Sequence, residues 1–186
     1  EILIITGRNK VSIENHFDYS FELEKTLEEN GKLELLKEVN KISEMSNIYY
    51  VRQKKPLGLG HAISCAEAFV GNEPFVVLLG DDIIYTDKSK GEVPVTKQLI
   101  EKYSELDGGN ILGVQEVLQK NVSKYGIIKP KNQIDAKTVM VEDFIEKPSI
   151  EEAPSRMAAL GRYVLEPEIF SYLKNTKPGK GGEIQL

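Results

Sequence analysis

Short apolar runs of strand length alternate with amphipathic segments of helix length through the first 115 residues of the chain. This alternation is typical of an α/β domain with a central, mostly parallel sheet and flanking helices. The run FVVLL at residues 75–79 is apolar throughout, as expected for a strand whose two faces are both covered. Strands are expected at residues 2–5, 48–52, 75–79 and 111–115, and helices at residues 8–16, 61–70 and 94–106.

The pattern changes after Tyr125. Three further strand candidates, residues 126–129, 139–146 and 158–165, follow one another with no long helix between them. We therefore expect a mixed or antiparallel extension of the sheet in the second half of the chain.

Residues 21–45 stand apart from the strand–helix alternation. They read as two amphipathic helices joined at Asn30-Gly31, a helix-stop signal, and inserted between two strands. Two interpretations stay open. The helices cover one edge of the sheet, or they form a contact between subunits, which would make the protein a homo-oligomer (a dimer or a tetramer).

Composition and charge exclude several classes of protein. The 186 residues carry a net charge of −5 and 40% hydrophobic residues, which fits a globular domain and lacks the basic footprint of a nucleic-acid-binding protein. Cys65 is the only cysteine, so neither a disulfide framework nor a cysteine-based zinc site is expected. This cysteine content fits the reducing cytosol, and we expect a cytoplasmic protein. No apolar run approaches the ~20 residues that span a membrane.

Both ends of the chain lie in apolar sequence. The chain starts at Glu1, directly before an apolar run, and stops at Leu186 without a polar tail. We therefore expect one domain over residues 1–186 that is incomplete at both ends.

A glycine-rich turn, QKKPLGLGHA at residues 53–62, follows one predicted strand and opens a predicted helix. Gly58 and Gly60 would let the backbone approach a flat or charged ligand, and the N–H groups of the helix start would face it. The side-chain amide of Gln53 can both donate to and accept from a pyrimidine edge. A turn that serves packing alone is the alternative, and for His61 packing is favoured over catalysis.

Two adjacent carboxylates, Asp81 and Asp82, follow the most apolar strand. Ligands of open α/β sheets bind beyond the carboxyl ends of strands. Mg²⁺ takes one or two carboxylates together with phosphate oxygens. We interpret Asp81 as a metal ligand and Asp82 as a cap of the following turn. The two histidines of the chain are too few for a histidine-based metal cluster.

The remaining candidates lie near the later strands. Glu146 could accept hydrogen bonds from sugar hydroxyls, and Lys147 could neutralise a phosphate if the backbone turns before Pro148. An exposed strand end with solvated charges is the alternative. The glycines around Gly161 can equally be turn residues, and Glu183 a surface charge.

In their order and spacing these motifs resemble those of the sugar nucleotidyltransferases, and among them the bacterial UTP–glucose-1-phosphate uridylyltransferases. The resemblance extends over nearly the whole chain. It is carried by TGRNKVSIENHFDYSFELE, RQKKPLGLGHA, PFVVLLGDDI, VSKYGII, EDFIEKP, APSRMAALGRYVL and KPGKGGEIQL.

The resemblance implies a Rossmann-like α/β fold and a reaction that joins UTP and glucose 1-phosphate into UDP-glucose and pyrophosphate with Mg²⁺. Its substrates would be the partners of the protein, with no nucleic acid and no membrane. The implied residues are Gln53 and Gly58 for uracil, Asp81 for the metal, Gly126, Glu146 and Gly161 for glucose, with Glu183 as a further candidate, and Lys147 for the sugar phosphate.

The chain also departs from the family pattern. The N-terminal glycine-rich turn with its Thr-Arg pair is absent, as is a second metal-binding aspartate, so we expect activity of the whole protein and not of these residues alone. Three alternatives remain: a nucleotidyltransferase for another base or sugar, such as a thymidine nucleotide, a non-catalytic regulator that binds nucleotide sugars, and an assembly module built on residues 21–45.

Overall fold

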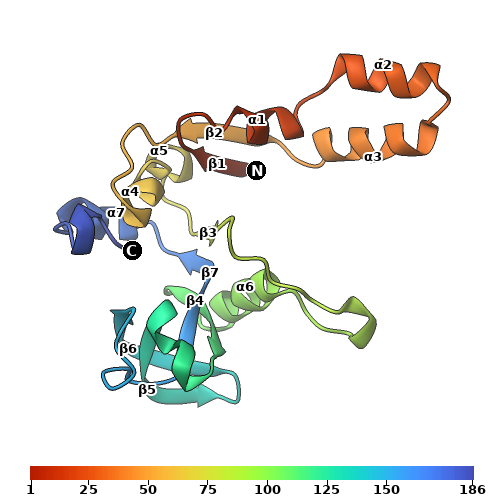
Figure 1. Cartoon of the computed structure of the whole chain (residues 1–186). Helices are drawn as coiled ribbons and strands as arrows, with labels where there is room; N and C mark the ends of the chain where they lie inside the picture. The colour runs from red at the N-terminus through yellow and green to blue at the C-terminus, as the bar shows by residue number, and fades with distance from the viewer. The chain divides into compact units, whose positions relative to one another are not determined.

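The computed structural model describes residues 1–186, apart from the side chain of Lys180 (Figure 1). Contacts divide the chain into two compact units, each described by itself. The first unit comprises Glu1–Asn72 with Pro167–Leu186, and the second comprises Glu73–Glu166. The single domain expected over residues 1–186 stays a prediction. No helix in the described part of the chain combines the length and apolar character needed to cross a membrane.

The first unit is built on a parallel pair of strands. β1 (Ile2–Thr6) pairs with β2 (Ile48–Arg52) in register from Ile2 opposite Ile48 to Thr6 opposite Arg52. Parallel strands need a crossover connection, and the chain between them supplies three helices. The helices of this unit are α1 (Val11–Phe17), α2 (Phe21–Glu29), α3 (Leu33–Ser43), α4 (Leu59–Ser64), α5 (Glu67–Val70) and α7 (Ile169–Asn175), with the short 3₁₀ helix η3 (Lys180–Gly182) near its end.

Residues 21–45 form the two predicted helices. α2 and α3 contact each other and are joined at Asn30-Gly31, as Figure 1 shows. Their apolar residues are only partly covered: Leu27 is buried, but several large apolar side chains are exposed, namely Phe21, Leu23, Leu33 and Leu35. The hairpin therefore presents an apolar surface, which we call the hairpin surface.

The second unit holds a five-stranded antiparallel sheet. Its strands run in the order β3 (Phe75–Leu78), β7 (Met157–Leu165), β5 (Gly126–Asp135) and β6 (Thr138–Glu146), and β4 (Ile111–Glu116) also pairs with β7. Helix α6 (Val95–Glu105) packs on β4 and β7. The 3₁₀ helices are η1 (Lys88–Lys90) and η2 (Gln119–Lys124).

The core of this sheet lies where β5 meets β7. Ile127 pairs with Ala158 across the two strands, and both are fully buried together with Val122 from η2. Apolar burial at such a position stabilises the fold by ~1.5–3 kcal/mol per large side chain.

The α/β class, the flanking helices and the antiparallel extension are confirmed. The balance within the sheets differs from the expectation, because parallel pairing among the described strands is confined to β1 and β2. β3 pairs antiparallel with β7 and leaves Leu78 57% exposed. A short apolar run has the same composition beside a parallel or an antiparallel neighbour, so its sequence did not distinguish the two.

The helix predicted over residues 61–70 is two short helices, α4 and α5, separated at Cys65 and Ala66. Strand β5 continues to Asp135, well beyond its predicted end at residue 129, and the other expected elements lie within a few residues of their predicted bounds. Helix α7 follows β7 and had no counterpart in the prediction.

Replacement of Ile127 by alanine should lower the free energy of unfolding by ~2–5 kcal/mol, because the side chain is fully buried and leaves a cavity. Ile134 on the same strand is 45% exposed, so Ile134→Ala should cost less than ~1 kcal/mol. Denaturant unfolding of both variants measures the difference. Equal losses would show that β5 is not anchored at Ile127.

Candidate functional site

Gln53 continues the ladder of the first unit beyond β2. Its backbone N–H donates to the carbonyl of Thr6 at 2.9 Å. Its side-chain Nε2 donates to the carbonyl of Gly58 at 3.1 Å and lies 2.9 Å from Nδ1 of His61. Because an amide NH₂ only donates, Nδ1 of His61 accepts and the proton of that ring resides on Nε2, an assignment that follows from the hydrogen-bond network. This leaves the side-chain Oε1 of Gln53 without a hydrogen-bond donor among the described residues.

The glycines of the turn are in close contact with a later segment of the same unit. A Cβ on Gly58 would lie 2.7 Å from the carbonyl oxygen of Ile184 and 2.8 Å from Cβ of Glu183. A Cβ on Gly60 would lie 2.5 Å from the carbonyl oxygen of Gln185. The absence of side chains at both glycines is therefore explained by contact with the chain itself, and Glu183 lies beside Gly58.

Two backbone hydrogen bonds fix this contact. The N–H of Ile184 donates to the carbonyl of Leu57 at 2.7 Å, and the N–H of Gly60 donates to the carbonyl of Ile184 at 2.9 Å. Gly58 also has φ +99°, where a side chain is strained. The backbone of residues 183–185 thus packs against the turn that carries Gln53 and stabilises its conformation.

In the second unit, Asp81 and Asp82 have different surroundings. Strand β3 ends at Leu78, and the turn that follows is closed by the N–H of Asp82, which donates to the carbonyl of Leu79 at 3.3 Å. Asp81 is exposed, and no described group hydrogen-bonds or ion-pairs with its carboxylate. The carboxylate Oδ2 of Asp82 accepts from the N–H of Gly161 at 2.6 Å.

The interpretation of Asp82 as a cap of the following turn is therefore wrong, because its carboxylate bonds to a neighbouring strand. The partner lies 79 residues away in the sequence, so no local pattern could have indicated it. Within the described residues no three His, Cys, Asp or Glu side chains gather as a metal cluster. Asp81 alone fits Mg²⁺ only where phosphate oxygens and water complete the shell.

Gly126 and Glu146 are cross-strand partners at the end of the β5–β6 ladder. A Cβ on Gly126 would collide with the ring of Phe144 and lie 2.9 Å from Oε2 of Glu146. Glycine at this position therefore makes room for the ring and the carboxylate, and Glu146 itself stays exposed.

The backbone turns at Lys147, as a shared face for Glu146 and Lys147 requires. Lys147 has φ +48°, and its N–H donates to the carbonyl of Tyr125 at 3.0 Å. Its Nζ lies 3.4 Å from Oε1 of Glu146, and the two side chains are 62% and 43% exposed, respectively. An exposed pair of this kind contributes ~0–1 kcal/mol to stability, so the lysine stays free to pair with another anion.

Two residues of β7 next to Gly161 join this region, and the motif Gly161-Arg162-Tyr163, although recognised in the sequence, indicated no role for either of them. Arg162 donates to the carbonyls of Leu79 and Asp82. Burial raises the pKa of the Tyr163 hydroxyl, and the negative charges of Glu146 and Asp82 raise it further. Tyr163 thus lies within electrostatic reach of both carboxylates, and its hydroxyl stays protonated. The roles of Arg162 and Tyr163 depend on contacts with residues that are distant in the sequence, so the local motif could not predict them.

The predicted site residues therefore fall into two sets. The first unit carries Gln53, Gly58 and Glu183, and the second unit carries Asp81, Gly126, Glu146, Lys147 and Gly161.

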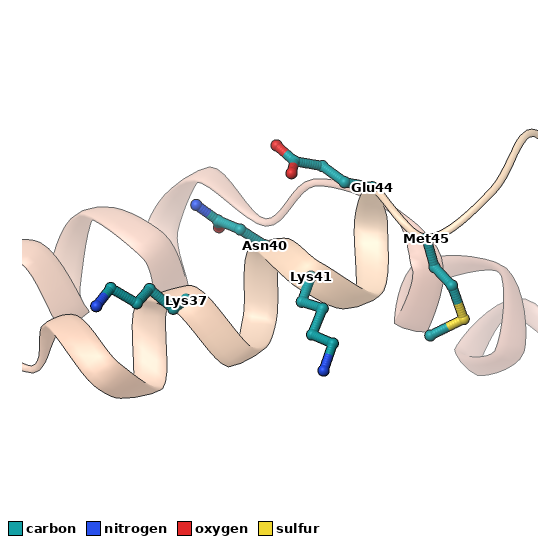
Figure 2. Close-up of a pocket in the computed structure, with 5 residues that line it drawn as sticks. All are labelled: Lys37, Asn40, Lys41, Glu44 and Met45. Carbon is teal, nitrogen blue, oxygen red and sulfur yellow. The ribbon is translucent and has the colours of Figure 1, made fainter.

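Two surface hollows lie apart from these residues. One of about 540 Å³ on α3 is lined by Lys37, Asn40, Lys41, Glu44 and Met45, as Figure 2 shows. The other, of about 1190 Å³, lies in the second unit against α6, β4, β5 and β6. No predicted site residue lines either hollow.

The chain belongs to the nucleotidyl transferase family, whose family model matches residues 1–186. Among its relatives, UTP–glucose-1-phosphate uridylyltransferase YngB of Bacillus subtilis (strain 168) is 55% identical over all 186 residues. A second UTP–glucose-1-phosphate uridylyltransferase of the same organism is 50% identical over the same length. The chain spans about 60% of the length of these curated relatives.

A solved structure of UDP-glucose pyrophosphorylase complexed with UDP-glucose matches with a TM-score of 0.84 and 41% identity. That match covers 98% of this chain and 64% of the solved one. The nucleotidyltransferase fold implied by the sequence resemblance is thereby confirmed.

Replacement of Gly58 by alanine should destabilise the protein more than replacement of Gly71. Gly71 also has positive φ, at +64°, but open space where its Cβ would be, so Gly71→Ala should cost only the ~1–3 kcal/mol of backbone strain. Gly58→Ala should cost this backbone strain and, in addition, the free energy needed to displace residues 183–185. Chemical denaturation of the two variants measures the excess, and equal costs would contradict the described contact.

Proposed function

We propose that the whole protein containing these residues transfers a uridylyl group from UTP to glucose 1-phosphate and releases pyrophosphate. The observation that carries the proposal is 50–55% identity, across all 186 residues, to proteins named UTP–glucose-1-phosphate uridylyltransferase. The proposal concerns the whole protein because the chain spans about 60% of those relatives. We infer a cytoplasmic location from the lone Cys65.

Gln53 and Gly58 are the proposed uracil contacts. The hydrogen bonds from Gln53 Nε2 to Gly58 and His61 leave Oε1 to accept from the N3–H of a uracil ring. A cytosine ring has no proton at N3, so this acceptor favours uracil over cytosine. Thymine has the same N3–H, and a preference for thymidine nucleotides therefore remains the second candidate, which initial rates with UTP and dTTP separate.

Asp81 is the proposed protein ligand of Mg²⁺. Its exposed carboxylate has no partner among the described residues, and oxygen donors suit this ion. When bound, Mg²⁺ would neutralise phosphate oxygens of the nucleotide. The contribution of the chain is to hold this carboxylate at the end of β3, where phosphates can reach it.

Lys147 is proposed to pair with the phosphate of glucose 1-phosphate. Glu146, Gly126 and Gly161 would hold the sugar, with Glu183 as a further candidate. A phosphate oxygen attacks the α-phosphorus of UTP, a new P–O bond forms, and the bond to pyrophosphate breaks. Two anions must meet, so neutralisation and positioning supply most of the catalysis, and no protein nucleophile is required.

A regulator without turnover would contain the same binding residues. Pyrophosphate release by the whole protein from UTP and glucose 1-phosphate decides between the two functions. Chelation of Mg²⁺ should abolish the release, because uncompensated phosphate charge opposes the attack. No release at saturating substrates and Mg²⁺ would contradict the proposed function.

In the whole protein, Lys147→Ala should lower kcat by two or more orders of magnitude, since each ~1.4 kcal/mol of lost transition-state stabilisation is tenfold in rate. Lys129→Ala is the matched control, because Lys129 on β5 is likewise exposed and paired with a glutamate, Glu142, at 2.9 Å. The control should keep near-wild-type turnover. Steady-state kinetics on folded variants provide the measurement, and equal effects of the two changes would reject the assignment of Lys147.

We further propose that the hairpin surface is a contact between two copies of the chain, which makes the protein a homo-oligomer. Four large apolar side chains on α2 and α3 are 46–56% exposed, and association of two copies would remove them from water. The hollow on α3 in Figure 2 lies on the same helix and has an exposed Met45 at its border.

Charges at Leu33 and Leu35 should shift the protein towards smaller species, because both side chains are exposed while Leu36 is partly buried. Leu33→Glu with Leu35→Glu is the test variant, and Glu38→Lys is the control on an exposed polar position of the same helix that does not line the hollow. Sedimentation velocity measures the change. A monomeric wild-type protein, or an oligomer that the double variant leaves intact, would count against this contact.

A further inference from the structure

The backbone of Gly161 is fully engaged by the turn that carries Asp81. Its N–H donates to the carboxylate of Asp82 at 2.6 Å. Its carbonyl accepts from the N–H of Leu79 at 2.9 Å and from Nη1 of Arg162 at 2.8 Å. Both polar groups of this glycine therefore bond to residues at the two ends of one turn or to the arginine that bridges them.

Arg162 spans the same turn with its guanidinium. Nη1 donates to the carbonyl of Leu79 at 3.2 Å, and Nη2 donates to the carbonyl of Asp82 at 2.6 Å. The planar guanidinium directs its donors in fixed directions, so one side chain holds the first and last carbonyls of the turn at a set spacing. Arg162 is partly buried, which strengthens bonds of this kind relative to exposed ones.

The turn and the strand are also in van der Waals contact. A Cβ on Gly161 would lie 2.7 Å from Cβ of Leu79 and 3.1 Å from Cβ of Asp82. The turn thus rests directly on β7 at a residue that has no side chain. Asp81 is the exposed carboxylate between these two anchored residues.

We propose that Asp82 and Arg162 are positioning residues that fix the Asp81 carboxylate relative to the backbone of Gly161. This inference rests on the proposed function, in which Asp81 holds Mg²⁺ and Gly161 contacts the sugar. Neither Asp82 nor Arg162 touches the reacting atoms. They act by holding two binding groups at one spacing, so loss of either should weaken the use of Mg²⁺ and of glucose 1-phosphate together.

If Asp82 and Arg162 only stabilise the fold, a different result is expected. Replacement of either residue would then lower thermal stability, while the enzyme that remains folded would keep its Mg²⁺ activation constant and its KM values. The two interpretations are separated by kinetic constants measured well below the melting temperature of each variant.

The test uses Asp82→Ala, Asp82→Asn and Arg162→Met in the whole protein. Asp82→Ala removes the acceptor of the Gly161 N–H and should raise both the Mg²⁺ activation constant and the KM for glucose 1-phosphate about tenfold, as expected for loss of a hydrogen bond to a charged group. Asp82→Asn should restore most of both constants, because its amide oxygen still accepts. Arg162→Met should behave like Asp82→Ala. The KM for UTP at saturating Mg²⁺ should stay within about twofold.

Two comparisons make the test specific. Arg156→Met is the control, because Arg156 stands directly before β7 in an exposed pair with Glu116 and should change none of these constants. Asp81→Asn should raise the Mg²⁺ constant without the rescue seen at position 82, since an amide is a poor substitute for a metal-binding carboxylate. Unchanged constants in folded Asp82→Ala and Arg162→Met, or an asparagine no better than alanine at position 82, would overturn the inference.

Hydrogen exchange provides a readout that does not depend on turnover. The amide of Gly161 should exchange at least about tenfold faster in Asp82→Ala than in the wild type and in Arg156→Met, because its acceptor is gone. If the wild type releases no pyrophosphate, the proposed function fails by itself. Titration of Mg²⁺ on wild type and Asp82→Ala in the presence of UTP, whose phosphate oxygens complete the shell, then still tests the positioning of Asp81, and equal affinities would overturn it.

Discussion

Strand β7 is the element on which the second unit depends, because it hydrogen-bonds to three other strands. β3 pairs with its second half, β4 pairs along it from Met157 to Val164, and β5 meets it at Ala158. Its buried residues include Ala158, Gly161 and Val164. Since a strand that bonds on both sides can shift only if all its partners shift, groups attached to β7 have defined positions. The turn with Asp81 is attached to it through Gly161 and Arg162.

The chain distributes its candidate binding groups between the two units. In the first unit, an amide with its orientation fixed by His61 lies on a turn that residues 183–185 support. In the second unit, an unpartnered carboxylate, a carboxylate–lysine pair and two crowded glycines surround the ends of antiparallel strands. Under the proposed function the first unit would contact the base, with Glu183 as a further sugar candidate, and the second unit would contact the phosphates and the sugar.

Local patterns predicted much of this structure. Strand β7 and helix α6 were expected within a residue or two because their apolar spacing is set by residues near one another in the chain. The candidate residues Asp81 and Lys147 could also be identified from the sequence, since each follows a recognisable strand. What the sequence could not provide were contacts between distant segments. The antiparallel partner of β3, the acceptor role of Asp82 and the packing of Ile184 on Gly58 all depend on residues more than 70 positions away.

Lys147 has a consequence for how sequences of this kind can vary. Its φ of +48° lies in a region where glycine has no steric cost and a side chain is strained by ~1–2 kcal/mol. Glycine at this position would therefore stabilise the folded protein while it removes the amine. If the amine of Lys147 pairs with the sugar phosphate as proposed, selection for thermal resistance and selection for turnover would favour opposite residues at this position.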